Sequence, residues 1–294
     1  MLLPEAIRSQ VSSMLTGICK KPVECNSATA IGGGSINETC SISTTNAGNY
    51  FLKYNFADRF PLMFACEARG LEILKNSRTL AIPEVLGHAE AGKYAFLLLE
   101  LIKPGPKVPH FWDDFALGLA ALHRNTTDNF GLDHDNYMGS LAQSNSYHSD
   151  WNSFFIEERL EKQIKLGRDN GEIPMEIVRH FQRLYTVLPE IIPEEPPALL
   201  HGDLWSGNFI TNHAGKACLI DPAVHYGHRE SDIAMTKLFG GFPDEFYSAY
   251  NRFFPLATGW QNRVNLLNLY PLLIHVNLFG GGYLGQVLKI VKQF

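Results

Sequence analysis

Three oxygen-bearing side chains stand close together in an otherwise apolar part of the sequence. Asp203 and Asn208 lie in LLHGDLWSGNF, residues 199–209, and Asp221 ends the apolar segment ACLID. Burying carboxylate or amide groups without partners costs free energy, so these residues either lie on solvated turns or serve as ligands. No Cys/His cluster of the zinc type accompanies them. Hard oxygen donors of this kind suit Mg²⁺ held together with substrate phosphates.

The spacing of these residues indicates one class of reaction in particular. Kinases present an Asp, an Asn five residues later, and then a second Asp directly after a strand, and this chain has the same order. In that arrangement the first Asp accepts the proton of the attacking hydroxyl, while the Asn and the second Asp hold the metal. Asp203 is therefore the candidate catalytic base, and Asn208 and Asp221 are candidate Mg²⁺ ligands. For His201 we expect a packing or turn-stabilising role.

Two charged residues upstream fit the same arrangement. Lys53 lies in a predicted third strand, and Glu67 lies on the helix predicted after it. The spacing of Phe64, Leu71 and Leu74 places these three apolar residues on one side of that helix. Taken singly, Lys53 is a solvated strand lysine and Glu67 a surface residue. Taken with the residues above, they predict an ion pair in which Lys53 contacts nucleotide phosphates.

Backbone groups are expected to complete a nucleotide site. A glycine turn between the first two strands lets bare backbone approach phosphates closely, although such a turn alone more often marks a simple hairpin. It lacks a full G-x-G-x-x-G or Walker pattern. The residues of this turn are Gly32, Gly33 and Gly34. At the end of the predicted fifth strand, the backbone groups expected to hydrogen-bond adenine are those of Glu100, Leu101 and Ile102.

The order of predicted elements indicates two parts. After an amphipathic helix that starts near Pro4, short strands and turn signals indicate a small antiparallel sheet with one inserted helix. Residues 102–110, IKPGPKVPH, contain three prolines and suit a linker. Helical segments predominate beyond them, with an irregular polar stretch at residues 129–148. We expect an α+β fold with an N-terminal nucleotide-binding lobe, residues 1–102, and a larger helical catalytic lobe, residues 103–294.

The composition of the chain excludes some classes of protein. The chain has 294 residues and a net charge of -5, which argues against a general polyanion-binding surface, so no nucleic-acid partner is expected. The five cysteines have scattered spacing and indicate reduced thiols in a cytoplasmic protein. The opening residues lack the pattern of a signal peptide. The most apolar late stretch, residues 270–288, is interrupted by His275, Asn277 and a run of three glycines, so no membrane span is expected.

Longer segments of the sequence carry a family resemblance. HGDLWSGN, IDPAVHYGHRESDIAM, KLFGGFP and NLFGGGYLG resemble the fructosamine kinase (ketosamine-3-kinase) family, which belongs with aminoglycoside and choline kinases in the protein-kinase-like fold. The resemblance runs from about Gly32 to the C-terminus. It implies a two-lobed fold and ATP-dependent phosphorylation of a sugar hydroxyl on a ketosamine, the adduct of glucose or ribose with an amine. The phosphorylated product falls apart and releases the amine.

The motif match also implies roles for individual residues. It makes Asp203 the base, Asn208 and Asp221 the Mg²⁺ ligands, and Lys53 with Glu67 the phosphate clamp. Two alternatives stay open: a kinase of the same fold that acts on an aminoglycoside- or choline-like alcohol, and a nucleotide-binding pseudokinase. The sequence leaves undetermined which ketosamine is preferred, whether free adducts or glycated proteins are the substrates, and the oligomeric state.

Several positions depart from the family pattern or carry two interpretations. Ser35 follows the glycines where some relatives have cysteine, so we predict no thiol switch there. GSLAQSN, residues 139–145, lacks the Thr-Pro of the family's G-x-T-P-Q-x-N loop, which puts substrate contacts from this loop in doubt. Trp205 either stacks on the sugar or supports the catalytic loop. For Arg229 we expect an internal ion pair with Asp232 or a neighbouring carboxylate.

Overall fold

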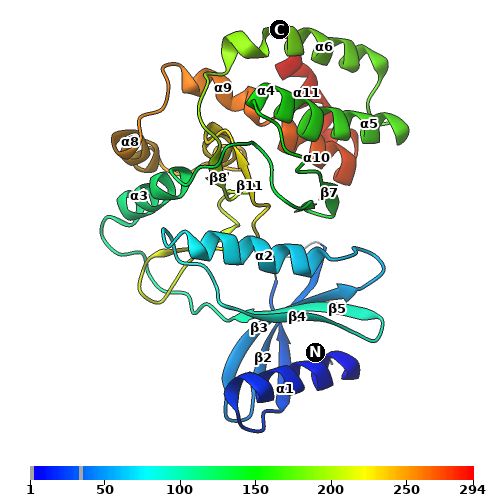
Figure 1. Cartoon of the computed structure of the whole chain (residues 1–294), viewed down its shortest axis with the longest axis vertical. Coiled ribbons are helices and arrows are strands. Elements are labelled where there is room, and N and C mark those ends of the chain that lie inside the picture. The colour runs from blue at the N-terminus through cyan, green and yellow to red at the C-terminus, as the bar shows by residue number, and fades with distance from the viewer. Residues whose placement is uncertain (1–2, 33–35) are drawn as a thin grey trace.

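The computed structural model describes residues 3–32 and 36–294. The N-terminal part of the chain is built on a five-stranded antiparallel sheet with the strand order β1-β2-β3-β5-β4 (Figure 1). The strands are β1 (Cys25–Ala30), β2 (Glu38–Thr44), β3 (Gly48–Phe56), β4 (Val85–Ala91) and β5 (Tyr94–Glu100). The expected small antiparallel sheet is confirmed.

Two helices cover opposite faces of this sheet. α1 (Glu5–Cys19) buries apolar residues spaced four apart, which pack on the face that carries Ile42 and Leu52. α2 (Met63–Asn76) packs on the other face, where Leu97 and Leu99 lie, and it separates the sheet from the rest of the molecule (Figure 1). The three residues predicted for the inner side of α2 are all buried: Phe64, Leu71 and Leu74.

The C-terminal part is mainly helical, as expected. Its α-helices are α3 (Phe111–His123), α4 (Trp151–Phe154), α5 (Glu161–Asp169), α6 (Met175–Ile191), α7 (Glu230–Met235), α8 (Asp244–Phe253), α9 (Trp260–Leu267), α10 (Leu269–Phe279) and α11 (Leu284–Val291). A π-helical turn, η1 (Phe155–Leu160), joins α4 to α5, and a short 3-10 turn, η2 (Gly281–Tyr283), joins α10 to α11. The periodicity of the sequence did not predict the π-helical turn.

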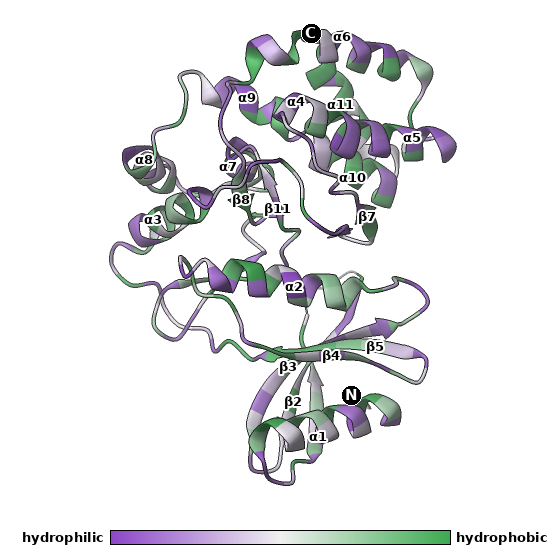
Figure 2. Cartoon of the chain, viewed as in Figure 1, coloured by the Kyte–Doolittle hydropathy of each residue, from purple (hydrophilic) through white to green (hydrophobic). Residues whose placement is uncertain are grey.

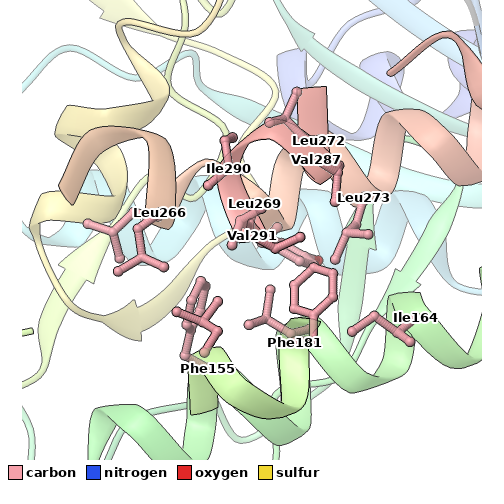
Figure 3. Close-up of a cluster of buried hydrophobic side chains, with 14 of the residues drawn as sticks. Phe155, Ile164, Phe181, Leu266, Leu269, Leu272, Leu273, Val287, Ile290 and Val291 are labelled. Carbon is pink, nitrogen blue, oxygen red and sulfur yellow. The ribbon is translucent and has the colours of Figure 1, made fainter. Parts of the chain in front are cut away.

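Two hydrophobic cores hold the helices together. In one, shown in Figure 3, Phe155 and Phe181 face Leu269, Leu273 and other aliphatic residues of α10 and α11. Figure 2 shows that α10 is mostly hydrophobic, whereas α5 at the surface is mostly hydrophilic. The second core packs α3 against α8 and reaches under the segment around residue 204. These cores give the short strands of the C-terminal part a rigid base.

Three two-stranded antiparallel sheets carry the loops of interest. They are β6 (Asn136–Met138) with β7 (Leu141–Gln143), β8 (Ala198–Leu200) with β11 (His225–Gly227), and β9 (Phe209–Thr211) with β10 (Ala217–Leu219). The stretch at residues 129–148 is thus only partly irregular, because β6 and β7 lie within it. Its polar character also misled the prediction, since Gln143 and Asn145 are fully buried.

The proline-rich linker lies against the β9–β10 hairpin. Pro104 forms an isolated bridge with Asn212, and the Gly105 N–H donates to the Thr211 carbonyl at 2.9 Å. A second connection joins the two parts where the Leu219 N–H donates to the Ala81 carbonyl at 2.9 Å. The sheet is therefore tied to the strand that leads into Asp221. In the described ranges of the chain, every helix falls short of the length and apolarity that a membrane span requires.

Candidate active site

Lys53, Glu67 and Asp221 meet between the two parts of the molecule. The Lys53 Nζ donates to Glu67 Oε1 at 2.7 Å and also pairs with Asp221 Oδ1. Lys53 is buried, whereas the Asp221 side chain is 46% exposed. Burial opposes the charge of Lys53, but the carboxylates of Glu67 and Asp221 outweigh it and raise its pKa. The lysine, which lies on β3, therefore stays a cation, held by one residue of α2 and one of the C-terminal part.

Asp203 and Asn208 lie at the two ends of the loop between β8 and β9. The Asn208 Nδ2 donates to the Asp203 carbonyl at 2.8 Å and to Asp203 Oδ2 at 2.9 Å. Burial raises the pKa of Asp203 to about 7, although the hydrogen bond from Asn208 lowers it, and the negative charges of Asp221 and Asp232 add to the increase. The loop thus presents a carboxylate that takes up a proton near neutral pH.

The loop of Asp203 is fastened to the segment of Asp221 at several points. His201 Nε2 donates to the Ile220 carbonyl at 2.9 Å, which leaves Nδ1 to accept from the Asp203 N–H at 3.3 Å. The Ile220 N–H donates to the Asn208 carbonyl at 3.0 Å. Gly202 has φ +84°, and a Cβ on it would lie 2.0 Å from the Ala223 carbonyl oxygen. Only glycine fits this contact, which brings the two segments side by side.

Asp232 completes this support, and the sequence analysis did not assign it such a role. Its buried carboxylate accepts from the backbone N–H groups of His201 at 2.8 Å and Gly202 at 2.9 Å, and it lies 3.2 Å from His123 Nε2. These partners hold the pKa of Asp232 below its usual range, even though burial acts in the other direction. The motif HRESDIAM carries the available signal, although the sequence analysis gives Asp232 only as a possible partner of Arg229.

Arg229 pairs with a different carboxylate. Its guanidinium donates to both oxygens of Glu195, from Nε at 2.6 Å and from Nη2 at 2.7 Å. The expected ion pair with Asp232 is therefore wrong, and the alternative of another carboxylate is right. Arg229 also donates to the carbonyls of Phe254 and Pro255. It holds the chain after α8.

The other predicted site residues are less closely connected. Gly32 is exposed, and a Cβ on it would meet nothing within 4 Å, so packing does not require glycine there. Gly33 and Gly34 lie outside the described residues. Glu100 ends β5, and Leu101 with Ile102 leads into the linker.

Trp205 has features of both interpretations. Its ring contacts Phe239 edge-on with centroids 5.7 Å apart, and a Cβ on Gly207 would lie 2.3 Å from the ring. The Trp205 carbonyl accepts from the Asn208 N–H at 3.0 Å, so the residue braces the turn between Asp203 and Asn208. The ring is nevertheless only half-buried. It supports the loop and is also partly accessible to solvent.

Comparison with known proteins decides the family. The model of the fructosamine kinase family matches residues 7–294. The chain belongs to the fructosamine kinase family. It is 41% identical over 266 residues to the probable ketoamine kinase of Enterococcus faecium, a match that covers 89% of this chain and 93% of the relative. The chloroplastic protein-ribulosamine 3-kinase of Arabidopsis thaliana is 36% identical over 272 residues, with 90% and 81% covered.

Solved structures give the same family and a wider fold group. The crystal structure of a fructosamine-3-kinase candidate from Thermobifida fusca superposes with a TM-score of 0.86 at 32% identity, over 97% of both chains. A macrolide 2'-phosphotransferase of type I has a TM-score of 0.58 at 14% identity, over 99% of this chain and 98% of that one, and so shares the fold. The chain is therefore a phosphotransferase with a two-lobed, kinase-like fold. Membership of a kinase family implies the use of ATP.

Proposed function

We propose that this chain transfers the γ-phosphoryl group of ATP to a sugar hydroxyl of a ketosamine and so starts the removal of the sugar from a glycated amine. The observation that carries the proposal is the meeting of Lys53, Glu67 and Asp221 beside the loop that holds Asp203 and Asn208. A buried cation faces two carboxylates there, and the remaining donors are oxygen atoms. This set matches the parts that phosphoryl transfer requires.

The division of labour follows the two parts of the chain. Residues 1–102 are the proposed nucleotide-binding lobe, and residues 103–294 are the proposed catalytic lobe. Lys53 contacts the phosphates of ATP while Glu67 fixes its direction. The backbone of the glycine turn approaches the same phosphates, and the backbone of Glu100, Leu101 and Ile102 binds adenine.

The donor set at the junction fits Mg²⁺. Asn208 uses its amide hydrogens on Asp203, so its side-chain oxygen is the atom that can contact a cation. Asp221 adds a carboxylate whose side chain is 46% exposed. Hard oxygen ligands and an open side suit Mg²⁺, which keeps phosphate oxygens and waters in its coordination shell. When bound, Mg²⁺ would neutralise charge on the phosphates.

Asp203 is the proposed base. A carboxylate with a pKa near 7 can accept the proton of the substrate hydroxyl. The hydroxyl oxygen then bonds to the γ-phosphorus of ATP, and the bond between this phosphorus and the oxygen that bridges the β- and γ-phosphates breaks, which releases ADP. Asn208 fixes the orientation of this carboxylate through the hydrogen bond that its Nδ2 donates. Lys53 stays charged and stabilises the phosphate oxygens on the other side of the transferred group.

The acceptor is assigned as a ketosamine because the family is named for fructosamine and its relatives for ketoamine and ribulosamine, which are all adducts of this class. Trp205, half-buried beside Asp203, offers an aromatic face for the sugar. We place the reaction in the cytoplasm. All five cysteines are free thiols, which agrees with a reducing compartment.

The test is ADP release with fructosamine, ribulosamine and erythrulosamine substrates. Turnover is expected with at least one of them, and Asp203→Asn should lose about 10³-fold in turnover while it keeps ATP affinity within about threefold. Aminoglycosides and choline in the same assay test the other acceptors. Turnover only with those alcohols would move the chain to another acceptor class, and no ADP release with any hydroxyl would contradict a kinase activity.

A further inference from the structure

The hairpin β6–β7 carries a buried amide network. Gln143 is 1% exposed, and its Nε2 donates to Asn136 Oδ1 at 2.8 Å and to the Ala223 carbonyl at 3.1 Å. Asn136 Nδ2 donates to the Val224 carbonyl at 2.8 Å. Two side-chain amides of one hairpin therefore hold two successive carbonyls of the segment that follows Asp221. Neither amide takes part in the chemistry assigned above.

Residues from the helical core fix the direction of these amides. The Tyr270 hydroxyl donates to Gln143 Oε1 at 2.8 Å, so Nε2 must face Asn136 and Ala223. Asn145 Nδ2 donates to Asn136 Oδ1 at 3.1 Å. Because every Gln143 group has a partner, a rotation of its amide would break all of its bonds.

An arginine stands behind the network. Arg159 Nη2 donates to Asn145 Oδ1 at 2.7 Å, and the guanidinium lies over the rings of Phe154 at 4.4 Å and Tyr270 at 5.3 Å. Arg159 is 1% exposed, and in the described part of the chain it has no ion pair with a carboxylate. Keeping an unpaired cation in the core costs free energy. The guanidinium fixes the Asn145 amide, and through it Asn136, from inside the core.

The segment that the network holds is unusual. Asp221 has φ +54°, a left-handed conformation that non-glycine residues adopt only when their surroundings impose it. The anchored residues Ala223 and Val224 begin two positions after it. On the near side, the Ala223 N–H donates to the His201 carbonyl at 2.9 Å. The backbone after Asp221 is thus held from the catalytic loop and from the β6–β7 hairpin.

We propose that Gln143 is a positioning residue that, through Ala223 and with Tyr270 and Asn136, holds the backbone of Asp221 in the conformation that directs its carboxylate toward the phosphate-bound metal. The inference rests on the proposed function, in which Asp221 is a Mg²⁺ ligand. It gives the GSLAQSN loop a role in place of substrate contact. Partners that orient a metal ligand typically change metal affinity or activity 10- to 100-fold when they are replaced.

The experiment measures ADP affinity by calorimetry with and without Mg²⁺, together with kcat, KM and the melting temperature. Gln143→Met removes the anchoring amide at similar volume. Gln163→Met is the matched control, because Gln163 is also buried and also accepts a side-chain hydrogen bond, from Asn277 at 2.9 Å, but lies in α5. Tyr270→Phe is a milder variant that removes one hydroxyl and should keep the fold.

Gln143→Met is expected to reduce the Mg²⁺-dependent gain in ADP affinity about tenfold or more and to lower kcat by a similar factor. Gln163→Met should lower the melting temperature comparably, yet keep both quantities within about twofold. Tyr270→Phe should reduce the Mg²⁺-dependent gain in ADP affinity about threefold. The double variant Gln143→Met with Tyr270→Phe should reduce this gain no more than Gln143→Met alone does, since both changes act through one amide. Equal Mg²⁺ effects in Gln143→Met and Gln163→Met would overturn the inference.

Asp221→Asn separates this inference from the proposed function. If Asp221→Asn abolishes the Mg²⁺ effect on ADP affinity while Gln143→Met leaves it intact, only the positioning role fails. If Asp221→Asn keeps the Mg²⁺ effect, the assignment of Asp221 as a metal ligand is wrong, and the role of Gln143 falls with it.

Discussion

Two groups of buried ionic residues in this molecule differ in their charge balance. Where the sheet meets the helical part, the single cation Lys53 faces the carboxylates of Glu67 and Asp221. In the helical part, two buried arginines each have their own carboxylate and use two nitrogen atoms on it. Arg263 bonds Glu230 at 2.7 and 2.6 Å, and Arg229 bonds Glu195 at 2.6 and 2.7 Å.

The difference indicates separate tasks. A paired arginine and carboxylate with parallel hydrogen bonds has little capacity left for a ligand, and it fixes the chain segments that it joins. The Lys53 group has one carboxylate in excess, and the Asp221 side chain is partly exposed. An excess of oxygen donors at an open edge is suited to a further cation, whereas the balanced pairs are suited to stability. The predictions below test this distinction.

The largest expected effect is on activity, from Lys53→Met. Removal of the cation should lower kcat/KM about 10³-fold, equivalent to ~4 kcal/mol, because the phosphates lose their charged contact. The melting temperature should fall less than after loss of a cation from a balanced pair, since Asp221 can turn into solvent. Steady-state kinetics and calorimetric melting measure both quantities. A variant that unfolds but retains kcat/KM in its folded fraction would remove the distinction between the groups.

Arg263→Met should show the opposite behaviour. Glu230 is left buried without its partner, which is expected to lower the free energy of unfolding by about 3 kcal/mol. Turnover per folded molecule should stay within about twofold of the original, because in the described residues Arg263, on α9, bonds Glu230 and the carbonyls of Ala257 and Thr258 and none of the proposed site residues. Urea unfolding gives the stability, and kcat is measured well below the transition. Loss of turnover without loss of stability would contradict a structural role for this pair.

Much of the fold was predictable because it depends on local patterns. The inner side of α2 followed from the spacing of Phe64, Leu71 and Leu74, and the strands followed from alternating runs between turn signals. The order of site residues along the chain also carried information. It suggested Lys53 and Asp221 as neighbours across 168 residues, and the ion pair places them in contact.

The contacts that were missed depend on tertiary structure alone. Arg229 reaches Glu195, which lies 34 residues upstream before β8, and no local pattern encodes that choice over Asp232. Gln143 and Asn145 lie in a polar sequence that resembles a solvated loop. A satisfied buried network and a solvated loop have the same composition, and only the packed neighbours distinguish them.

A smaller effect is expected when charge is removed but shape is kept. Glu67→Gln retains an oxygen that accepts from Lys53, so the lysine keeps its direction with a weaker partner. We expect kcat/KM to fall about tenfold, equivalent to ~1.4 kcal/mol, with little change in melting temperature. Glu195→Gln is the matched control in the balanced group and should lower the melting temperature without lowering kcat. If Glu67→Gln lowered only the melting temperature and Glu195→Gln lowered only kcat, the catalytic and structural roles of the two groups would be reversed.

The smallest effect concerns a neutral histidine beside the balanced pairs. His228 is fully buried and lies 4.0 Å from Glu195, and burial lowers its pKa despite the nearby carboxylates. The unfolded chain therefore takes up a proton at this histidine as pH falls through about 6.5, whereas the folded state does so only at lower pH. His228 thus lowers the free energy of unfolding as the pH decreases. His228→Gln should remove that contribution, worth about 1 kcal/mol over the first pH unit below 6.5.

The comparison must be made against the original chain at each pH, because other groups titrate in the same range. Asp203 and Glu67 have raised pKa values, so their protonation in the folded state increases stability as pH falls. Urea unfolding at pH 6.5 and 5.5 gives the difference, and His213→Gln, which makes the same replacement at an exposed histidine, is the matched control. An unchanged slope in His228→Gln would mean that the pKa of His228 is the same in the folded and unfolded states, so that His228 also takes up a proton in the folded protein over this pH range. The Arg229 and Glu195 pair would then carry an extra cation and would no longer be balanced.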